Sequence, residues 1–579
     1  MPQQRFFLLD LLKGLAIFAV VLYHLGLFEY GYLGVEIFLV VSGFLTTKSV
    51  VGAYNRKGAF SYGHFLFKRI VRLFPLVVLL CTCAFVIAYF VQLPDNFKNT
   101  CETTIGTLTF TNNFVQYITS GNYWATSNDF KPLMHTWYLA VLLQFYLLYP
   151  LAISLLCKMK VRLDRALNLI IIAGGVMSFL AYLLGCSSDA FKFFLLPCRY
   201  WDFALGAYVA IRPKHGVGDK KVYWALLSIC LLICVNVNFA SNAYRLVLTA
   251  MATALIIANI DAERSCCRLR LSALTLLGRA SFSIYVWHQF IFAFYRYVVD
   301  ATFNVLSYSV VLAVSLAIGL ASYSLFEQKF TNWMTSNKMR SLSVVGLNAL
   351  VAIALVMVGF RFYKQNGIVR DVPELGISKD NTSFQSQDYN SRNNVFDTDF
   401  PTNNKKNILV LGDSFARDWI NVLRESGALT SYNISVHSLD DSVALTRAKK
   451  ADIIFMANNG PFNFHRTMPE IANHQYYRVG HKGFGKCNGN VYDRILLGLS
   501  GYDQTFRYDD SLNIDERKLF GKHFIDMMAC IELSKGQYPY FTPNHKFFSH
   551  DGIHLTQAGA QRFAHLLNMR KFLLDFARK

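Results

Sequence analysis

Residues 408–419 read ILVLGDSFARDW, and this stretch decides the fold of the C-terminal part of the chain. The apolar run 408–411 has the composition of a short buried strand, and the residues after Ser414 are typical of a helix start. Gly412 and Asp413 would turn the chain so that the Ser414 hydroxyl stands at a strand-to-helix turn, beside the helix N-terminal amides. Taken alone, Gly-Asp-Ser is equally typical of a turn followed by a helix N-cap.

A second polar motif lies near the end of the chain, in FFSHDGIHLTQAGAQRFAHLLN at 547–568. Asp551 and His554 stand three residues apart, just before an amphipathic helical pattern. A serine nucleophile needs a base to take its proton, and that base needs an acceptor that fixes its tautomer. Asp551 and His554 could supply both functions for Ser414.

The two motifs together resemble the SGNH (GDSL-like) hydrolase and acetyltransferase family. This resemblance implies a flavodoxin-like α/β fold over residues 406–579, with Ser414 as nucleophile, His554 as general base and Asp551 as its orienting carboxylate. The family's Gly-x-Asn-Asp block has its nearest match in MANNG at 456–460, which implies oxyanion donors from the Ser414 amide and from Asn458 or Asn459. A domain that kept the fold without catalysis is the alternative.

The rest of the chain is far more apolar. Of 579 residues, 53% are hydrophobic and 16% are charged, which is too apolar for a soluble protein and indicates membrane spans. A span needs about 20 mostly apolar residues. Before residue 364 we expect about eleven spans, centred near Ala19, Leu39, Ala84, Leu143, Gly174, Leu205, Leu227, Met251, Tyr285, Ala313 and Ala352.

Lys and Arg residues gather in alternate loops between these spans. The positive-inside rule therefore predicts a cytoplasmic N-terminus and, after an odd number of spans, a C-terminal domain outside the cytoplasm. The net charge of +20 is then explained by topology, so we expect no nucleic-acid partner. No metal site and no permanently bound cofactor are expected.

The first span carries Lys13 at its cytoplasmic end and His24 deeper in the membrane, and Arg69 and Arg72 share one helical face at the start of the third span. An ionisable residue inside a span is a functional candidate, although a histidine packed between helices is the alternative. Guanidinium pairs suit phosphate binding, although simple anchoring at the membrane surface would explain them as well.

These features resemble the acyltransferase-3 family of membrane O-acyltransferases over residues 1–335. The motifs that carry the resemblance are the Lys13–His24 spacing, GYLGVEIFLVVSGFLTT, Arg69 with Arg72, HTWYLAVLLQFYLLYP, FLLPCRYWDFALGA, LGRASFSIYVWH and SYSLFEQKF.

This chain departs from the family pattern at two places. Lys13 replaces an arginine, and Leu142 and Leu143 replace a Glu-Glu pair. Glu36 and Asp10 remain as candidate acidic partners.

Residues 336–363 are expected to form an additional transmembrane helix, and residues 364–405 a periplasmic linker. Cys487 and Cys530 both fall in the outer domain, where a disulfide could form, but the sequence does not decide the pairing.

The resemblances imply a protein embedded in the lipid of the bacterial inner membrane, with a periplasmic C-terminal domain. They imply transfer of an acetyl group from cytoplasmic acetyl-CoA to an envelope polysaccharide or glycolipid such as lipopolysaccharide O-antigen. Arg69 and Arg72, with Lys13, would hold the donor, and His24 would be catalytic. A membrane-anchored glycan O-acetyl esterase and a transporter with a vestigial outer domain are the alternatives. The acceptor sugar, the acyl chain, the oligomeric state and the effect of the two leucines are not determined by the sequence.

Overall fold

The computed structural model describes residues 7–577 apart from 59, 121–127, 185–188, 213–241, 259–271, 301–302, 373–388, 439–440, 461–467 and 486–487. The chain forms two compact units. The first, here called the membrane unit, comprises Met1–Phe90 and Asn99–Tyr363, and the second, the C-terminal unit, comprises Val91–Lys98 and Lys364–Lys579.

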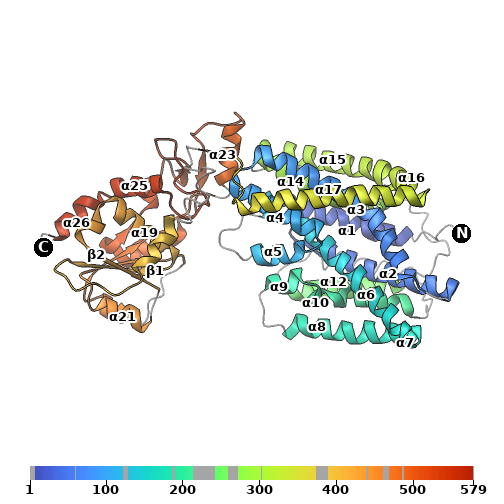
Figure 1. The fold of residues 1–579 in the computed structure, drawn as a ribbon. Coiled ribbons are helices and arrows are strands. Elements are labelled where there is room, and N and C mark those ends of the chain that lie inside the picture. The colour runs from blue at the N-terminus through green and yellow to red at the C-terminus, as the bar shows by residue number, and fades with distance from the viewer. Residues whose placement is uncertain are drawn as a thin grey trace. The chain divides into compact units, whose positions relative to one another are not determined.

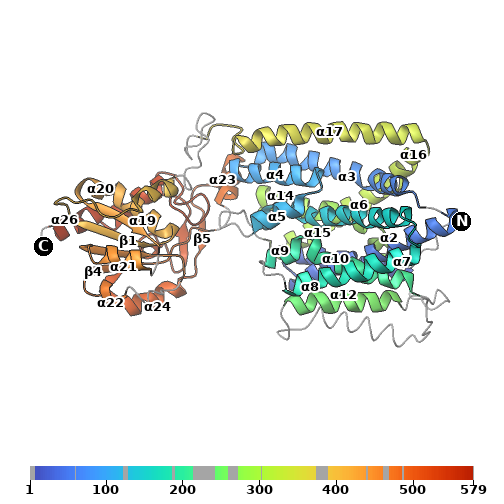
Figure 2. The same cartoon turned by 60° about the horizontal axis from the view of Figure 1, so that its bottom comes forward.

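The membrane unit is a bundle of long apolar helices (Figures 1 and 2). Within the described residues, six helical segments are long and apolar enough to cross a membrane: Glu29–Arg56, Tyr62–Val91, Met134–Lys158, Leu163–Leu184, Val305–Thr335 and Lys338–Lys364. Ten of the eleven predicted span centres fall in described helices, whereas the centre near Leu227 lies outside the described residues. A membrane unit is thus confirmed, and the helix number stays a prediction.

The helices that lie wholly or mainly in this unit follow the sequence pattern closely. They are α1 Phe7–His24, α2 Gly34–Lys57, α3 Tyr62–Val91, α4 Pro94–Leu108, α5 Asn112–Ser120, α6 Trp137–Lys158, α7 Leu163–Asn168, α8 Gly174–Leu184, α9 Asp189–Phe194, α10 Leu196–Ile211, α12 Asn242–Ala258, α13 Ser272–Arg279, α14 Ser281–Val298, α15 Val305–Ser322, α16 Thr331–Thr335 and α17 Lys338–Lys364. Between α15 and α16 the helix is widened into a π-helix, Tyr323–Phe330, a distortion that occurs often at functional sites.

Small residues allow α2 and α10 to approach each other closely. A Cβ atom on Gly43 of α2 would lie 2.0 Å from the Phe203 carbonyl oxygen, and one on Gly206 of α10 would lie 1.9 Å from the Val40 oxygen. Close backbone packing of this kind is how membrane helices associate without a hydrophobic driving force. The glycines of the SGFL and ALGA segments are therefore helix-packing residues.

The C-terminal unit is built on a parallel sheet with the strand order β2-β1-β3-β4-β6. This is the flavodoxin-like order of a doubly wound fold, in which ligands bind at the carboxyl ends of the strands where the order reverses, between β1 and β3. The strands are β1 Asn407–Gly412, β2 Asn433–His437, β3 Ile453–Ala457, β4 Gln475–Val479 and β6 Phe524–Ile525, and β5 Thr505–Arg507 pairs with β7 Gln537–Pro539 in a small antiparallel sheet.

Alternate residues of β1 enter two different hydrophobic cores. Ile408 and Val410 pack with α19 (Ser414–Glu425), α25 (Gln557–Leu566) and α26 (Met569–Ala577), whereas Leu409 and Leu411 pack with α21 (Ser442–Ala448), α22 (Met468–Ile471) and α24 (Ser511–Phe520). The sheet is covered by helices on both faces, which is why β1 is apolar throughout (Figure 1). The expected α/β class is confirmed.

Two segments that precede residue 406 pack as part of the C-terminal unit. Leu93 packs in a hydrophobic core with Val491 and Tyr492 of α23 (Asn488–Leu496). The side-chain amide of Asn96 donates a hydrogen bond to the side-chain oxygen of Asn490 over 3.2 Å. The described end of the predicted linker packs on α19, where Asn390 and Asn393 are fully buried. Cys530 is a free thiol, and Cys487 lies outside the described residues.

Candidate functional site

Ser414 occupies the first position of α19, directly after β1. Asp413 is the N-cap, since its Oδ1 accepts a hydrogen bond from the Phe415 amide over 2.9 Å. Gly412 has φ +150°, and a Cβ there would lie 1.7 Å from the Ala457 carbonyl oxygen of β3. The sharp turn that presents Ser414 at the switch point of the sheet therefore needs glycine at position 412.

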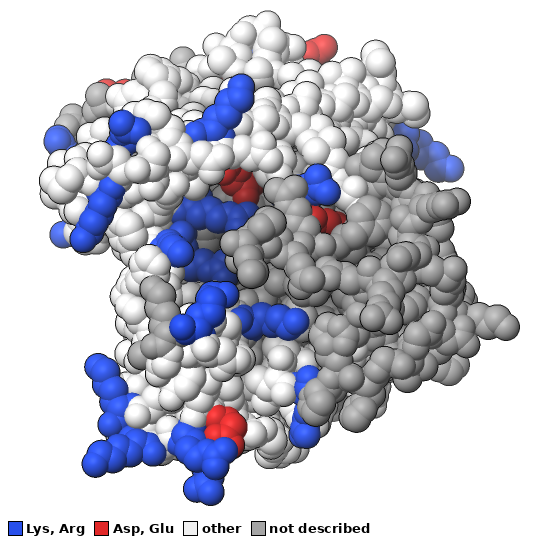
Figure 3. Space-filling view, turned by 90° about the vertical axis from the view of Figure 1, so that its right-hand side faces the viewer, with Lys and Arg blue, Asp and Glu red and all other residues white. Residues whose placement is uncertain are grey.

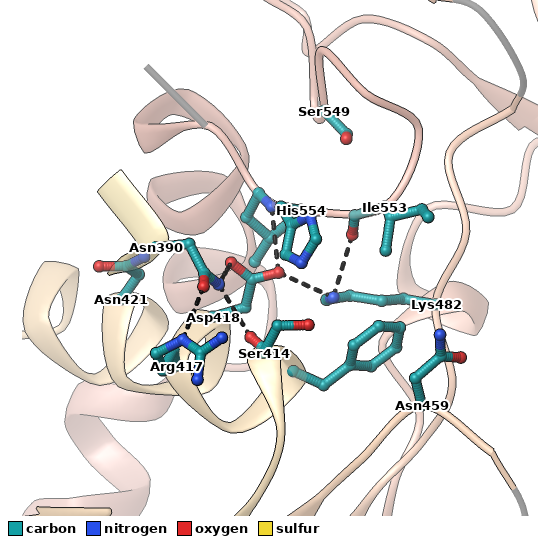
Figure 4. Close-up of polar contacts among 12 residues, drawn as sticks. Asn390, Ser414, Arg417, Asp418, Asn421, Asn459, Lys482, Ser549, Ile553 and His554 are labelled. Atoms are coloured by element: carbon teal, nitrogen blue, oxygen red, sulfur yellow. Dashed lines mark hydrogen bonds and ion pairs between the residues drawn. The ribbon is translucent and has the colours of Figure 1, made fainter. Parts of the chain in front are cut away.

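Asp551 and His554 are joined in the geometry that the motif predicts. Nδ1 of His554 lies 2.8 Å from Oδ2 of Asp551. A carboxylate can only accept, so Nδ1 carries the proton and Nε2 of the neutral ring is left with a lone pair. Figure 4 shows the His554 ring directed toward Ser414. The structure thus brings the three predicted residues together.

The second oxygen of Asp551 fixes the loop that carries this pair. Oδ1 accepts hydrogen bonds from the Ser549 hydroxyl and from the amides of Ile553 and His554, over 2.8 to 2.9 Å. Burial acts to raise the pKa of Asp551, but the hydrogen bond and charge of His554, together with these amides, lower the pKa below its usual value. The carboxylate is therefore ionised at neutral pH.

The predicted oxyanion residues lie after β3, on the other side of the switch point. The Asn459 backbone amide donates to Asp413 Oδ2 over 2.9 Å, which ties this loop to the Ser414 turn. The Asn458 side chain is 5% exposed and donates to the Gly460 carbonyl oxygen over 3.1 Å. One amide hydrogen of Asn458 is thus used within its own loop, and oxyanion binding by either asparagine stays a prediction.

Two buried residues beside Ser414 and His554 were not recognised in the sequence. Asp418, one turn after Ser414 on α19, forms an ion pair of 2.8 Å with Lys482, which follows β4. Both side chains are at most 2% exposed. Lys482 stands in GHKG at 480–483, a stretch without a motif, so only the tertiary structure shows that it belongs to the site.

In the membrane unit, His24 is part of a cluster of three histidines. Its ring centroid lies 5.1 Å from that of His288 on α14, and His288 lies 5.1 Å from His135, which precedes α6. His135 and His288 stand inside stretches that resemble family motifs, but the sequence alone did not mark them as neighbours of His24. Among the described residues, no group of histidine, cysteine or carboxylate side chains is arranged to hold a metal ion.

Backbone carbonyls fix the tautomers of two of these rings. Nδ1 of His288 donates to the Tyr285 oxygen over 2.7 Å, and Nε2 of His135 donates to the Val286 oxygen over 3.1 Å. Within the part of the chain that the structure describes, Nε2 of His288 has no hydrogen-bond partner, although it is buried. The cluster therefore offers an unused basic nitrogen beside His24.

The two arginines near the start of α3 make different contacts. Arg69 lies over the Tyr146 ring, 4.8 Å from its centroid, whereas Arg72 forms an ion pair of 2.5 Å with Glu327. Glu327 lies in the π-helical segment and also accepts a hydrogen bond from Ser283 over 2.9 Å. Two stretches 255 residues apart thus meet at one ion pair.

Lys13 is paired with Asp10 over 2.8 Å, and Asp10 also contacts Arg279 over 3.4 Å. Asp10, one of the two candidate acidic residues, therefore balances the charges of Lys13 and Arg279. Figure 3 shows the face of the molecule on the side of the N-terminus, where Lys and Arg side chains gather around a hollow and carboxylates are few. Such a face is suited to a polyanionic ligand.

Glu36, the other candidate acidic residue, is fully buried and paired with Arg199 of α10, which also lies 3.8 Å from Asp202. This ion pair links α2 to α10. Leu142 and Leu143, which replace the family's two glutamates, are 6% and 5% exposed and pack as ordinary apolar residues. No carboxylate takes their place at these two positions.

The apolar bundle with its histidine cluster, joined to an α/β unit that presents serine, histidine and aspartate together, defines a membrane protein equipped for acyl chemistry. A model of the family described as an acyltransferase domain matches residues 7–324, and the chain belongs to this acyltransferase-3 family.

Several curated proteins resemble the chain over this region. A Staphylococcus aureus (strain MRSA252) protein provisionally named an O-acetyltransferase is 25% identical over 382 residues, which are 61% of this chain and 63% of that protein. The O-acetyltransferase OatA of Staphylococcus aureus (strain NCTC 8325 / PS 47) is 26% identical over 55% of this chain and 56% of its own length. BcsY of Komagataeibacter xylinus, provisionally named a membrane-bound transacylase, is 28% identical over 56% of this chain and 83% of its own length.

The match covers 63% of the length of the Staphylococcus aureus (strain MRSA252) relative, less than two thirds. No solved structure matches the chain.

Proposed function

We propose that the chain transfers an acetyl group from cytoplasmic acetyl-CoA across the membrane to a hydroxyl group of a cell-envelope glycan such as lipopolysaccharide O-antigen. The observation that supports this proposal is that one chain carries two clusters of side chains suited to acyl chemistry. One is the histidine cluster of the acyltransferase domain, and the other is the Ser414, His554 and Asp551 arrangement of an SGNH-type C-terminal domain. The names of the relatives favour O-acetyl transfer.

The donor would bind at the cytoplasmic face. Its phosphates require cations, and Arg69 and Arg72 lie near the start of α3, with Lys13 on α1. Arg72 is half exposed while paired with Glu327, so its guanidinium can contact Glu327 and still present N–H groups to an anion. The ion pair then orients Arg72, because Glu327 is itself fixed by Ser283.

The thioester end would reach toward His24, which acts as general base or carries the acetyl group onward. His288 assists this step, because its Nε2 lone pair is available beside the His24 ring. When His24 takes the acetyl group, the proton that it gives up goes to the departing CoA thiolate. The Tyr285 carbonyl oxygen keeps the proton of His288 on Nδ1, so the Nε2 lone pair stays on the side of the cluster. Only the acetyl group crosses the membrane, and CoA stays on the cytoplasmic side.

In the C-terminal unit, the Ser414 oxygen attacks the acyl carbonyl while Nε2 of His554 takes its proton. His554 gives this proton to the departing acyl carrier, so the ring is neutral again, and an acetyl ester is left on Ser414. The glycan hydroxyl then attacks this ester, gives its proton to His554, and receives the acetyl group. His554 returns the proton to the Ser414 oxygen, so the site is restored. Asp551 stabilises the imidazolium in both steps.

A membrane-anchored glycan O-acetyl esterase is the second candidate. It is favoured by the arrangement of Ser414, His554 and Asp551, which could hydrolyse an ester without a donor. Water would then replace the glycan hydroxyl in the second step. The two functions predict opposite changes when Ser414 is removed, because a transferase adds acetyl groups and an esterase removes them.

The test is mass spectrometry of envelope glycans from cells that express the wild-type chain, Ser414→Ala, His24→Ala or no chain. Transfer predicts acetylated glycan only with the wild-type chain. More acetylation in Ser414→Ala than in wild type would support the esterase. Wild-type acetylation in His24→Ala would make His24 a packing residue.

A further inference from the structure

Asp418 and Lys482 contact the backbone on both sides of His554. Asp418 Oδ2 accepts a hydrogen bond from the Leu555 amide over 3.1 Å, and Lys482 Nζ donates to the Ile553 carbonyl oxygen over 3.0 Å. The two polar backbone groups that flank the histidine are thus held by one ion pair (Figure 4). The pair thus contacts the backbone next to His554, and Asp551 contacts the His554 ring itself.

The same pair is fixed to the nucleophile helix. Asp418 Oδ1 accepts from the Asn390 amide over 2.7 Å, and that amide also donates to the Ser414 carbonyl oxygen over 2.8 Å. Lys482 Nζ lies 3.4 Å from the centroid of the Phe415 ring. The pair therefore connects the first turn of α19, which carries Ser414, with the loop that carries His554.

A structural role alone does not explain why this pair is ionic. Removing two charges from water is energetically costly, and a well-packed apolar pair is often equally stable. The Lys482 ammonium group contacts the Asp418 carboxylate, the Ile553 carbonyl oxygen and the Phe415 ring. All three partners lie next to Ser414 or His554 in the sequence or on the same helix, so the positive charge acts within the site. Loss of either partner would leave an unbalanced charge close to the base.

We propose that Asp418 and Lys482 are a positioning pair for His554, which holds the base against Ser414 and keeps the charge beside it balanced. This inference rests on the proposed role of Ser414 and His554 and names the residues that tune that site. Neither residue contacts the reacting atoms, so both act through His554.

Other charged and titratable groups lie on the segments that carry His554 and the pair, or interact with those segments. They are His550 and Asp551 on its own loop, Asp413 and Arg417 on or next to α19, His481 beside Lys482, and Asp95, whose pKa is raised by burial and by the charge of Asp551. All of these groups are unchanged in the variants described next. A difference between two variants at one pH therefore reports the pair itself.

The experiment measures the pH dependence of kcat/KM for hydrolysis of phenyl acetate by the full chain in detergent, with released acetate quantified. Lys482→Met leaves the Asp418 carboxylate unbalanced, which favours the protonated base and should shift the acidic limb up by about one pH unit. Asp418→Asn leaves the Lys482 cation unbalanced and should shift the limb down by a similar amount. In the double variant, the acidic limb of the kcat/KM profile should return to its wild-type position. The maximal kcat/KM should be lower, because the ion pair that holds the backbone around His554 is lost.

Lys518→Met is the matched control, because Lys518 forms an exposed ion pair with Asp515 in the same unit. The acidic limb of its kcat/KM profile should coincide with that of the wild type. If Lys482→Met does not fold, Asp418→Asn decides alone: a downward shift supports the pair, and an unmoved limb overturns it. Shifts of Lys482→Met and Asp418→Asn in the same direction would also overturn it. If Ser414→Ala hydrolyses phenyl acetate at the wild-type rate, the proposed function itself fails, which is a different result.

Discussion

Replacing Asp551 by asparagine should abolish the base while leaving the loop folded. The side-chain carbonyl oxygen of the introduced asparagine can still accept from Ser549 and from the amides of Ile553 and His554, as Oδ1 of Asp551 does now. The side-chain nitrogen takes the place of Oδ2, 2.8 Å from Nδ1 of His554, and it can only donate. His554 must then carry its proton on Nε2, which faces Ser414 and can no longer accept.

The expected loss follows from the chemistry of this tautomer change. In a serine protease the same substitution lowers kcat about 10⁴-fold, which corresponds to roughly 5 kcal/mol of activation free energy. We expect a similar loss in hydrolysis of phenyl acetate by the full chain in detergent, measured as kcat/KM at neutral pH. Thermal unfolding should change little, since only the hydrogen bond to Nδ1 is altered.

A second aspartate–histidine pair in the same unit provides the control. Asp397 Oδ1 lies 2.8 Å from Nδ1 of His437, and the aspartate side chain is 48% exposed. Asp397→Asn is chemically the same substitution in a pair that takes no part in the proposed chemistry, and it should leave hydrolysis unchanged. Activity of Asp551→Asn within about tenfold of wild type would refute the assigned role of the His554 tautomer.

Three further predictions concern other parts of the chain. A reporter active only outside the cytoplasm should be active after Lys579 and silent in the loop 211–221, and the opposite pattern would reverse the proposed direction of transfer. Arg72→Ala should weaken CoA binding in detergent by at least about tenfold because a charged hydrogen bond is lost, whereas Lys68→Ala on the same helix end should not, and equal affinities would reduce Arg72 to an anchoring residue. Burial lowers the pKa of His550 from 6.5 to about 4, so acidification favours the unfolded state, which binds the proton first, and stability should fall by roughly 3 kcal/mol between these values. Thermal unfolding at several pH values should show this loss in the wild type but much less in His550→Gln, and equal acid sensitivity would contradict the prediction.

Local sequence patterns predict the secondary structure around the C-terminal site well. The apolar run 408–411 forms β1, Asp413 caps α19, and Asp551 bonds to His554 as the three-residue spacing requires. Each of these features depends on residues close together in the chain. Periodicity and turn chemistry are sufficient to predict them.

The remaining contacts depend on how distant segments pack. His24, His135 and His288 meet only because α1, the start of α6 and α14 lie together, and Arg72 meets Glu327 across 255 residues. Hydropathy marks the spans but does not say which helices are neighbours.

The same reasoning applies to residues that lie outside the motifs. Lys482 could not be singled out, because a lysine in a glycine-rich loop is normally solvated and here it is buried against Asp418. The predicted linker also gave no sign that Asn390 would be buried beside Ser414.

The central claim is that an acetyl group that starts on cytoplasmic acetyl-CoA reaches Ser414 on the other side of the membrane. The direct measurement supplies isotopically labelled acetyl-CoA only to the cytoplasmic face of sealed vesicles that contain the full chain, followed by mass spectrometry of the peptide that contains Ser414. Labelled acetyl ester should be found on Ser414 in the wild type and should be absent in His24→Ala. Labelled acetyl that reaches an externally added glycan in Ser414→Ala would contradict the account, because the membrane unit would then complete the transfer alone.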